Sequence, residues 1–340
     1  MKKIPGLRND FGELYEKLLT NQETNLFFAA IDLGIFQELS DWRSPGELVE
    51  KLRLNRQNTM VFLDSLVSCN LIEKKGGRFR NLPAAEGSLA LKNVMYLGDC
   101  FLTYYYWYNM SPGRICNLVR NSPAESGVND MNSEDLWAEQ ARLSVHVPGA
   151  GMAQLATRLV SSLHEYPSFQ KMLDLGCGSG LFGTSIAMSH PSMKAVLFDR
   201  PAVARVAREV VDAYEVGDRI EVAGGDYIND PIGGDYDLVW ASETLHFAGK
   251  HLDEVVKKIY DALNPGGVFI SFSNGKTDDG TIPKEMTLRF PMPALFWDDM
   301  GLNEGVIAES MIKAGFASVQ SRTVMTPIGE MAVDIARKRS

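Results

Sequence analysis

The chain has 340 residues, 45% of them hydrophobic and 23% charged, and it carries a formal net charge of −9. The length and composition are those of a globular protein with room for two domains, each with its own core. An acidic surface repels nucleic-acid phosphates, and no apolar run reaches the roughly 20 residues that span a bilayer, so neither nucleic acid nor a membrane is an expected partner.

The cysteines and the N-terminal segment indicate the cellular compartment of the protein. Cys69, Cys100, Cys116 and Cys177 are scattered and form no C-x-x-C pair, which favours a reducing compartment and argues against a structural zinc site. The first residues, MKKIPGLRNDFGELYEKL, lack the apolar stretch of a secretion signal. We therefore expect a cytoplasmic protein with no metal.

The region from about residue 10 to 90 has helical periodicity and ends in a short hairpin. The stretch NLFFAAIDLGIFQEL is a helix that Gly34 should terminate, and SPGELVEKLRL begins a second helix with Ser44 as its cap. The stretch NRQNTMVFLDSLVSCNLI is a third helix, and EKKGGRFRNL has two strands around the turn 76–77. Three helices closed by a hairpin indicate a winged-helix domain, which we assign to residues 1–95.

A winged helix raises the alternative of a ligand-sensing DNA-binding regulator. A recognition helix needs basic and amide side chains on its exposed face to reach phosphates and bases. The third predicted helix carries a single basic residue, Arg56. We therefore expect this domain to form a homodimer or to cover a substrate, and not to bind DNA.

Residues 96–165 are predicted to be a helical linker that lines the substrate cleft. Its segment FLTYYYWYNM places five aromatic residues in a row, and five consecutive helix positions point all round the axis. One interpretation is a helix buried between domains or subunits. The other is that Tyr104 and Trp107 line a pocket for a flat aromatic or polycyclic molecule.

From residue 166 onward, strands and helices alternate. The predicted strands are KMLDLG, MKAVLFD, RIEVAGGD, YDLVWASE and GGVFISFS, and helical patterns lie between most of them. This alternation predicts a Rossmann-like, doubly wound α/β sheet over residues 166–340. The last two strands, SVQSRTVM and EMAVDIARK, should form an antiparallel pair at one edge.

The stretch MLDLGCGSGLFG supports two interpretations. Gly178, Gly180 and Gly183 have the G-x-G-x-x-G spacing of a dinucleotide site, whereas Asp174 followed by alternate glycines from Gly176 suits S-adenosylmethionine. A dinucleotide would bring its pyrophosphate near the Asp174 carboxylate, and the like charges would repel. The sulfonium and ammonium groups of S-adenosylmethionine would be attracted, so a nicotinamide oxidoreductase is disfavoured.

Two further acids follow in the order that such a site requires. Asp199 ends the second strand, 25 residues beyond Asp174, where an acid can bind ribose hydroxyls. Asp226, in GGDY after the third strand, could accept a hydrogen bond from an adenine amino group. Together with the glycine loop, these acids predict an S-adenosylmethionine site.

These motifs resemble the small-molecule S-adenosylmethionine-dependent O-methyltransferases over nearly the whole chain. The likeness rests on AAIDLGIFQEL, NLIEKKGGRFRNLPAAEGSL, LKNVMYLGD, LDLGCGSG, LFDRP, GGDY, LHF and LNPGG, in the family's order. It implies a winged-helix dimerisation domain, a Rossmann-like catalytic domain, and S-adenosylhomocysteine as the product. It implies Asp174, Gly176 and Gly178 near the methionine part of the cofactor, Asp199 on the ribose, and Asp226 with Tyr227 beside the adenine. The further implied cofactor contacts are Gly180, Arg200 and Ser242, and Ser242 stands where the family has a lysine near the adenine.

His246, just after the fourth strand, matches the family's catalytic histidine. A phenol titrates near 10, so holding it ionised at pH 7 costs about 4 kcal/mol. A base with a pKa near 6.5 that takes this proton contributes roughly 10²–10⁴-fold, and the remaining requirement is alignment of oxygen, methyl and sulfur. The resemblance therefore implies methyl transfer to a hydroxyl of a small aromatic or polycyclic metabolite.

The chain departs from the family around this histidine. Ser273 and Gly301 stand where the family has two supporting glutamates, and Glu304, Asp278 or Asp279 are the candidate substitutes. FAGKH follows the histidine in place of the usual Asp-Trp pair. A more acidic acceptor, C-methylation, or a relative that binds the cofactor without transferring methyl would fit these changes.

The remaining candidates are assigned by position in the chain. The predicted substrate contacts are Tyr104, Trp107, His146, Met152, Met292 and Trp297. Three further histidines, His164, His190 and His251, are expected on the surface.

Overall fold

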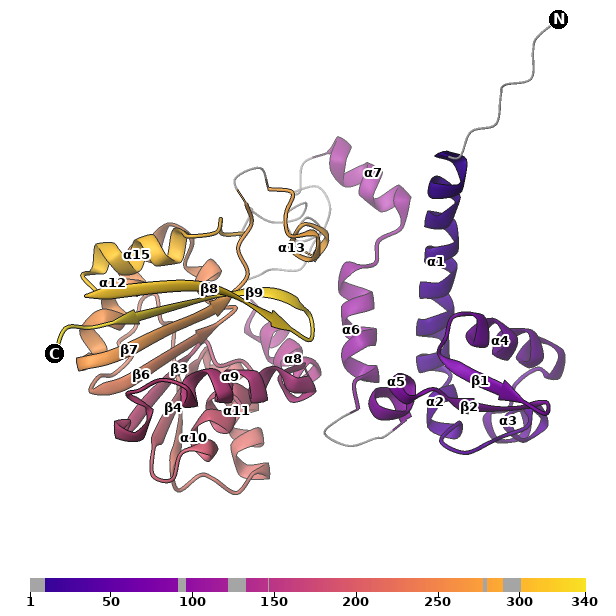
Figure 1. Cartoon of the computed structure of the whole chain (residues 1–340), viewed down its shortest axis with the longest axis horizontal. Helices are drawn as coiled ribbons and strands as arrows, with labels where there is room; N and C mark the ends of the chain where they lie inside the picture. Colours follow the sequence, from indigo (N-terminus) through magenta and orange to yellow (C-terminus); the bar gives the residue numbers. More distant parts are fainter. Residues whose placement is uncertain (1–9, 91–95, 122–132, 146, 278–279, 290–300) are drawn as a thin grey trace, which may run out of the picture. The chain divides into compact units, whose positions relative to one another are not determined.

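The computed structural model describes residues 10–90, 96–121, 133–145, 147–277, 280–289 and 301–340 (Figure 1). Contacts divide the chain into two compact units, Met1–Trp107 and Tyr108–Ser340. None of the helices in these ranges has both the length and the apolar character needed to cross a bilayer. The three functional regions predicted from the sequence, 1–95, 96–165 and 166–340, remain predictions.

The first unit has the element order expected from the sequence. Its elements are α1 (Asp10–Asp32), α2 (Ile35–Glu38), α3 (Pro45–Leu52), α4 (Arg56–Ser68), β1 (Ile72–Lys75), β2 (Arg78–Asn81), α5 (Pro83–Ala85) and most of α6 (Gly98–Tyr108). Gly34 separates α1 from α2 with a φ of +69°, a left-handed conformation that glycine adopts without steric cost. Ser44 and Glu47 form the capping box of α3, and β1 pairs antiparallel with β2.

The aromatic segment lies on α6. The ring of Tyr105 lies 4.1 Å from that of Phe28 on α1, measured between ring centroids, and Tyr104 is half-buried. Part of the aromatic run therefore packs inside the first unit.

The second unit contains a seven-stranded sheet in the order β5-β4-β3-β6-β7-β9-β8. Its strands are β3 (Lys171–Leu175), β4 (Lys194–Asp199), β5 (Ile220–Gly224), β6 (Tyr236–Ser242), β7 (Leu263–Ser273), β8 (Ser318–Thr326) and β9 (Gly329–Arg337). Strands β3 to β7 run parallel, and the β8–β9 pair is added antiparallel through β9. This confirms the predicted α/β fold with its antiparallel edge pair.

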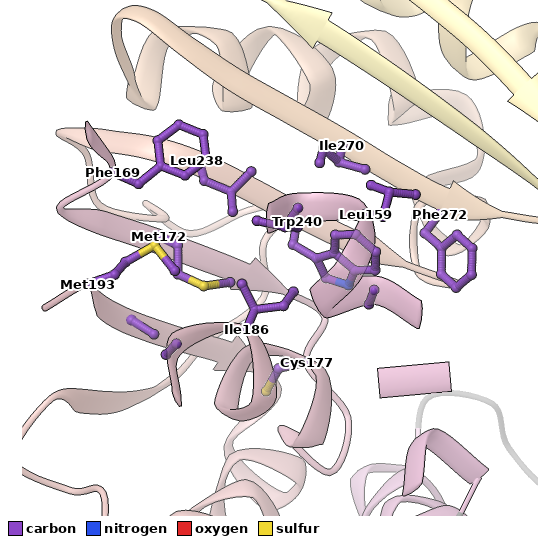
Figure 2. Close-up of a cluster of buried hydrophobic side chains, with 14 of the residues drawn as sticks. Leu159, Phe169, Met172, Cys177, Ile186, Met193, Leu238, Trp240, Ile270 and Phe272 are labelled. Atoms are coloured by element: carbon purple, nitrogen blue, oxygen red, sulfur yellow. The ribbon is translucent and has the colours of Figure 1, made fainter. Parts of the chain in front are cut away.

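Helices cover both faces of this sheet. The helices of the second unit are α7 (Pro112–Arg120), α8 (Glu134–Ser144), α9 (Ala153–Ser161), α10 (Leu181–Ser189), α11 (Pro201–Ala213), α12 (Leu252–Ala262), α13 (Lys284–Arg289) and α15 (Val306–Ala314). One core gathers side chains of α9, α10 and α11, and Figure 2 shows Leu159, Ile186 and Trp240 within it. The other core packs α12 and α15 against the opposite face.

One sequence-based expectation fails in this unit, that of an exposed His190. The side chain is buried, its Nε2 lies 3.1 Å from the Tyr166 carbonyl, and its Nδ1 accepts from the Met193 amide. Met152 is 3% exposed and packs within the first core, and its predicted contact with the substrate stays a prediction. His164 is exposed as expected.

Candidate functional site

The site is built where the chain changes direction across the sheet. From β3 the chain adds β4 and β5 on one side, and from β6 it adds β7 on the other. In open α/β sheets, ligands bind beyond the carboxyl ends of the strands at such a switch point. Here it lies between β3 and β6, and the loops that carry the predicted residues follow β3, β4, β5 and β6.

The glycine loop after β3 is held against β4 by backbone hydrogen bonds. The amides of Gly176 and Cys177 both donate to the Phe198 carbonyl, at 2.8 and 3.1 Å. Gly176, Gly178 and Gly180 have φ angles of +67°, +55° and +77°, which residues with side chains rarely adopt. Glycine at these positions lets the chain turn sharply from β3 into α10.

Asp174 lies beneath this loop. Its side chain is 1% exposed, and its Oδ2 accepts from the Gly183 amide in the first turn of α10 at 2.8 Å. Burial, opposed by this bond and reinforced by the charge of Asp199, raises the pKa of Asp174 to about 7. Asp174 therefore helps to fix the loop against the start of α10, and its predicted contact with the cofactor stays a prediction.

The position of Asp174 also separates the two cofactor classes. A dinucleotide places its pyrophosphate on the amides at the start of the helix after the glycines. In this chain the Gly183 amide already has a carboxylate partner within the protein. The helix end is therefore poorly suited to a second anion, in agreement with a cofactor that lacks phosphate.

Asp199 fixes the other side of the loop. Its Oδ2 accepts from the Gly178 amide at 2.8 Å, and its Oδ1 accepts from the Arg200 amide at 2.7 Å. The carboxylate is half-buried at the end of β4, and burial raises its pKa despite these two bonds. Each oxygen keeps a lone pair for a further donor such as a ribose hydroxyl.

The three loop glycines meet different surroundings. A Cβ atom at Gly176 would lie 2.0 Å from the Oγ1 of Thr244, and one at Gly180 would lie 2.8 Å from a methyl of Leu197. A Cβ at Gly178 would meet no heavy atom within 4 Å. The backbone therefore faces open space at Gly178, as a loop must where it binds a cofactor.

The residues after β5 form a network with the turn after β6. Asp226 accepts from the Ile228 amide at 3.0 Å and from the side-chain amide of Asn229 at 2.7 Å. Tyr227 donates to the Thr244 carbonyl at 2.8 Å, and burial raises the pKa of its phenol to about 12. Thr244 is buried against Gly176, so it joins three strand ends.

Thr244 and its neighbour Glu243 were missed by the sequence analysis. Threonine and glutamate are common after strands, and no spacing rule distinguishes these two. The only local signal is their place between Ser242, the half-buried last residue of β6, and His246.

His246 lies in the short helix η5 (Leu245–His251) that follows β6. Its imidazole is half-buried, and its centroid lies 4.0 Å from that of the Phe247 ring, which packs edge-on against Trp137. The histidine therefore stands at the carboxyl edge of the sheet, beside the switch point. His251 ends the same helix, and its Nδ1 lies 2.8 Å from a Glu254 oxygen.

The carboxylates expected to support His246 are not at the matching strand positions. Ser273 ends β7 and pairs with Ala332, while the Glu304 side chain is exposed and its backbone amide donates to Lys276. Asp278 and Asp279 lie outside the described residues.

Most predicted substrate contacts also fall outside the described part of the chain. His146, Met292, Trp297 and the Trp107 side chain are in this group. Tyr104 is described in α6, and its predicted role stays a prediction.

Sequence similarity connects the chain with known proteins. A family model described as an O-methyltransferase domain matches residues 139–292. The chain is 26% identical over 258 residues to the N,N-dimethyltransferase OxyT of Streptomyces rimosus, covering 72% of each protein. It is 25% identical over 328 residues to the tetracenomycin polyketide synthesis 8-O-methyl transferase TcmO of Streptomyces glaucescens, covering 93% of this chain and 94% of that protein.

Structural similarity extends over the full length. Human N-acetylserotonin methyltransferase, solved in complex with S-adenosylmethionine, matches 99% of this chain and 100% of its own with a TM-score of 0.79. Sequence identity in that alignment is 20%, so the match establishes a shared fold.

Proposed function

Because this chain is a member of the small-molecule S-adenosylmethionine-dependent O-methyltransferases, we propose that it methylates a hydroxyl of a small aromatic or polycyclic metabolite with His246 as general base. The observation that carries this proposal is the place of His246, half-buried in the short helix that follows β6 and two residues after Thr244, which packs against Gly176 of the glycine loop. An imidazole there can take a hydroxyl proton at neutral pH.

S-adenosylmethionine is the cofactor, S-adenosylhomocysteine is the product, and the bound cofactor supplies an electrophilic methyl group. We assign the ribose hydroxyls to Asp199 and the adenine side to Asp226 and Tyr227, because these groups follow neighbouring strands at the switch point. Gly178 provides the open backbone beside them. Asp174, Gly176 and Gly180 hold the loop in shape, and Arg200 and Ser242 border it.

A second candidate reaction is methyl transfer to an amine. It is favoured by the similarity to OxyT, which is named an N,N-dimethyltransferase, and by Ser273 and Gly301, which carry no carboxylate. The nitrogen of a neutral arylamine is a stronger nucleophile than the oxygen of a neutral phenol and can lose its proton after methyl transfer, so the amine depends less on a base.

Matched acceptors distinguish these reactions. We expect transfer of labelled methyl from S-adenosylmethionine to 2-naphthol or a larger hydroxylated polycycle, and little transfer to 2-naphthylamine of the same shape. The reverse preference would establish the amine reaction. Equal failure of polycyclic phenols, amines and carbon acceptors, despite tight binding of S-adenosylhomocysteine, would contradict both candidates.

We also propose a cytoplasmic homodimer formed through the first unit. Along α1, Phe11, Leu14, Tyr15 and Leu18 recur at helical spacing and are 48% to 71% exposed. An apolar stripe of this kind is typical of a surface that pairs with another protein. Sedimentation of the wild type as a dimer, and of Leu14→Asp/Leu18→Asp as a folded monomer, would support this assignment; a monomeric wild type would contradict it.

A further inference from the structure

Glu243 adopts an unusual backbone conformation at the centre of the site. It directly follows β6 and has a φ of +49°, in the left-handed region that costs free energy for any residue with a Cβ atom. Such conformations persist where the surrounding structure holds them, and they concentrate at functional sites. Glycine or asparagine would adopt this conformation at a lower cost in free energy, so the presence of a glutamate at this position must be explained by the contacts of its side chain.

The backbone and the side chain of Glu243 both form hydrogen bonds at the end of the neighbouring strand β7. Its backbone amide donates to the Phe272 carbonyl at 3.0 Å, and its side-chain Oε1 accepts from the Asn274 amide at 2.8 Å. The two bonds lie on either side of Ser273, the last residue of β7. The second bond uses the terminal carboxylate of the glutamate, and the side-chain oxygen of asparagine or aspartate at this backbone position would end one methylene short of it.

The following residues bind in the other direction. Thr244 accepts from the Tyr227 phenol beyond β5 and packs against Gly176 beyond β3. His246 lies two residues further along the chain. The turn that carries the histidine is therefore fixed to the cofactor-binding loops through Thr244 and to the end of β7 through Glu243.

We propose that Glu243 is a positioning residue for methyl transfer. It holds the turn after β6 against β7, and so it fixes the distance from the His246 imidazole to an acceptor lying beyond these strands. The proposal rests on the proposed function of His246. It assigns the hydrogen-bonding reach of the side chain, and not its negative charge, as the feature that matters.

Two substitutions separate reach, charge and backbone conformation. Glu243→Gln keeps an oxygen at the same distance and removes the charge, whereas Glu243→Asn tolerates the left-handed backbone but is one methylene too short. We expect the Gln variant to keep kcat within about 3-fold, and the Asn variant to lose roughly 10–100-fold because a small misplacement of a catalytic group is costly. The Kd for S-adenosylhomocysteine should change less than about 3-fold in both, since their cofactor loops are intact.

Glu215 provides the control, because it also has a left-handed φ, of +55°, and lies at the exposed C-terminal end of α11. Glu215→Asn should leave kcat and Kd unchanged. A Glu243→Asn variant as active as the wild type, or a Glu243→Gln variant as impaired as Glu243→Asn, would overturn the proposal.

An NMR measurement that needs no methyl acceptor separates the test of Glu243 as a positioning residue from the test of His246 as general base. The chain has five histidines, so the His246 ring signal can be assigned by NMR from its loss in His246→Gln. With S-adenosylhomocysteine bound, Glu243→Asn should shift this signal while Glu243→Gln and Glu215→Asn leave it in place; an unshifted signal in Glu243→Asn would overturn the positioning role. Full activity of His246→Gln would instead refute the base, whatever the NMR result for Glu243.

Discussion

The two sides of the switch point are built differently: the cofactor side comprises the loops after β3, β4 and β5, and the acceptor side comprises the turn after β6 and the end of β7. On the cofactor side, Asp174 and Asp226 accept hydrogen bonds from backbone amides of the segments that follow them, and Asp199 accepts one from the Gly178 amide in the adjacent loop after β3. On the acceptor side, Glu243 reaches across to β7 from a left-handed backbone, and Ser273 carries no carboxylate. The cofactor loops are therefore held by hydrogen bonds from backbone amides to carboxylates and carbonyls of their own or an adjacent strand–loop segment, whereas the turn that carries His246 is held to the end of β7 by a long side chain on a left-handed backbone.

This difference suggests that binding and catalysis can be changed separately. Substitutions in the cofactor loops that keep the hydrogen bonds of their backbone amides should leave the rate of methyl transfer unchanged once the cofactor is bound. Substitutions on the β6–β7 side should impair turnover without weakening the cofactor complex.

The largest expected effect is on the acceptor side. His246→Gln removes the base but keeps a polar side chain of similar size, so we expect kcat for a phenol to fall about 10²–10⁴-fold. The Kd for S-adenosylhomocysteine, measured by calorimetry, should stay within about 3-fold. His251→Gln, at the exposed end of the same helix, is the control and should behave as wild type. Equal losses in kcat and cofactor affinity would refute the proposed separation.

The next effect concerns stability and pH on the cofactor side. The pKa of Asp174 is about 7 in the folded protein and near its ordinary 3.8 when unfolded, so the folded state binds this proton more tightly. Asp174 therefore stabilises the fold most below about pH 4, and this contribution is lost as pH rises to about 7. Asp174→Asn stays neutral and retains an oxygen acceptor.

The stability of Asp174→Asn relative to the wild type should therefore increase between pH 4 and 8, by up to about 4 kcal/mol. Urea unfolding at several pH values measures this change. Asp261→Asn, which alters an exposed ion pair with Lys257, should show little pH-dependent difference from the wild type. A flat profile for Asp174→Asn would mean that the buried carboxylate titrates normally.

The smallest effects distinguish two glycines in one loop. Gly176→Ala places a methyl group against buried Thr244 and keeps a strained φ, so we expect a loss of about 2–4 kcal/mol in unfolding free energy. Gly178→Ala has room for its methyl group and should lose only about 1 kcal/mol. Its main effect should be about 10-fold weaker binding of S-adenosylhomocysteine, because the methyl group fills the space that the cofactor would approach. Equal stabilities would contradict this difference in packing.

The sequence predicted those features that depend on local patterns. Alternating strands and helices specified the parallel sheet, Ser44 capped its helix as expected, and the glycine loop, Asp199 and Asp226 followed successive strands in order. Periodicity, capping and strand-end loops are properties of neighbouring residues, so they are visible in one sequence.

Tertiary structure decided which groups face one another. It buried Asp174 behind its loop, placed Met152 and His190 in the interior, and brought Thr244 against Gly176. It also joined Glu243 to the amide after Ser273, 31 residues away. Burial and contacts across neighbouring parallel strands depend on sheet order and register, because residues far apart in sequence meet only when the strands pair.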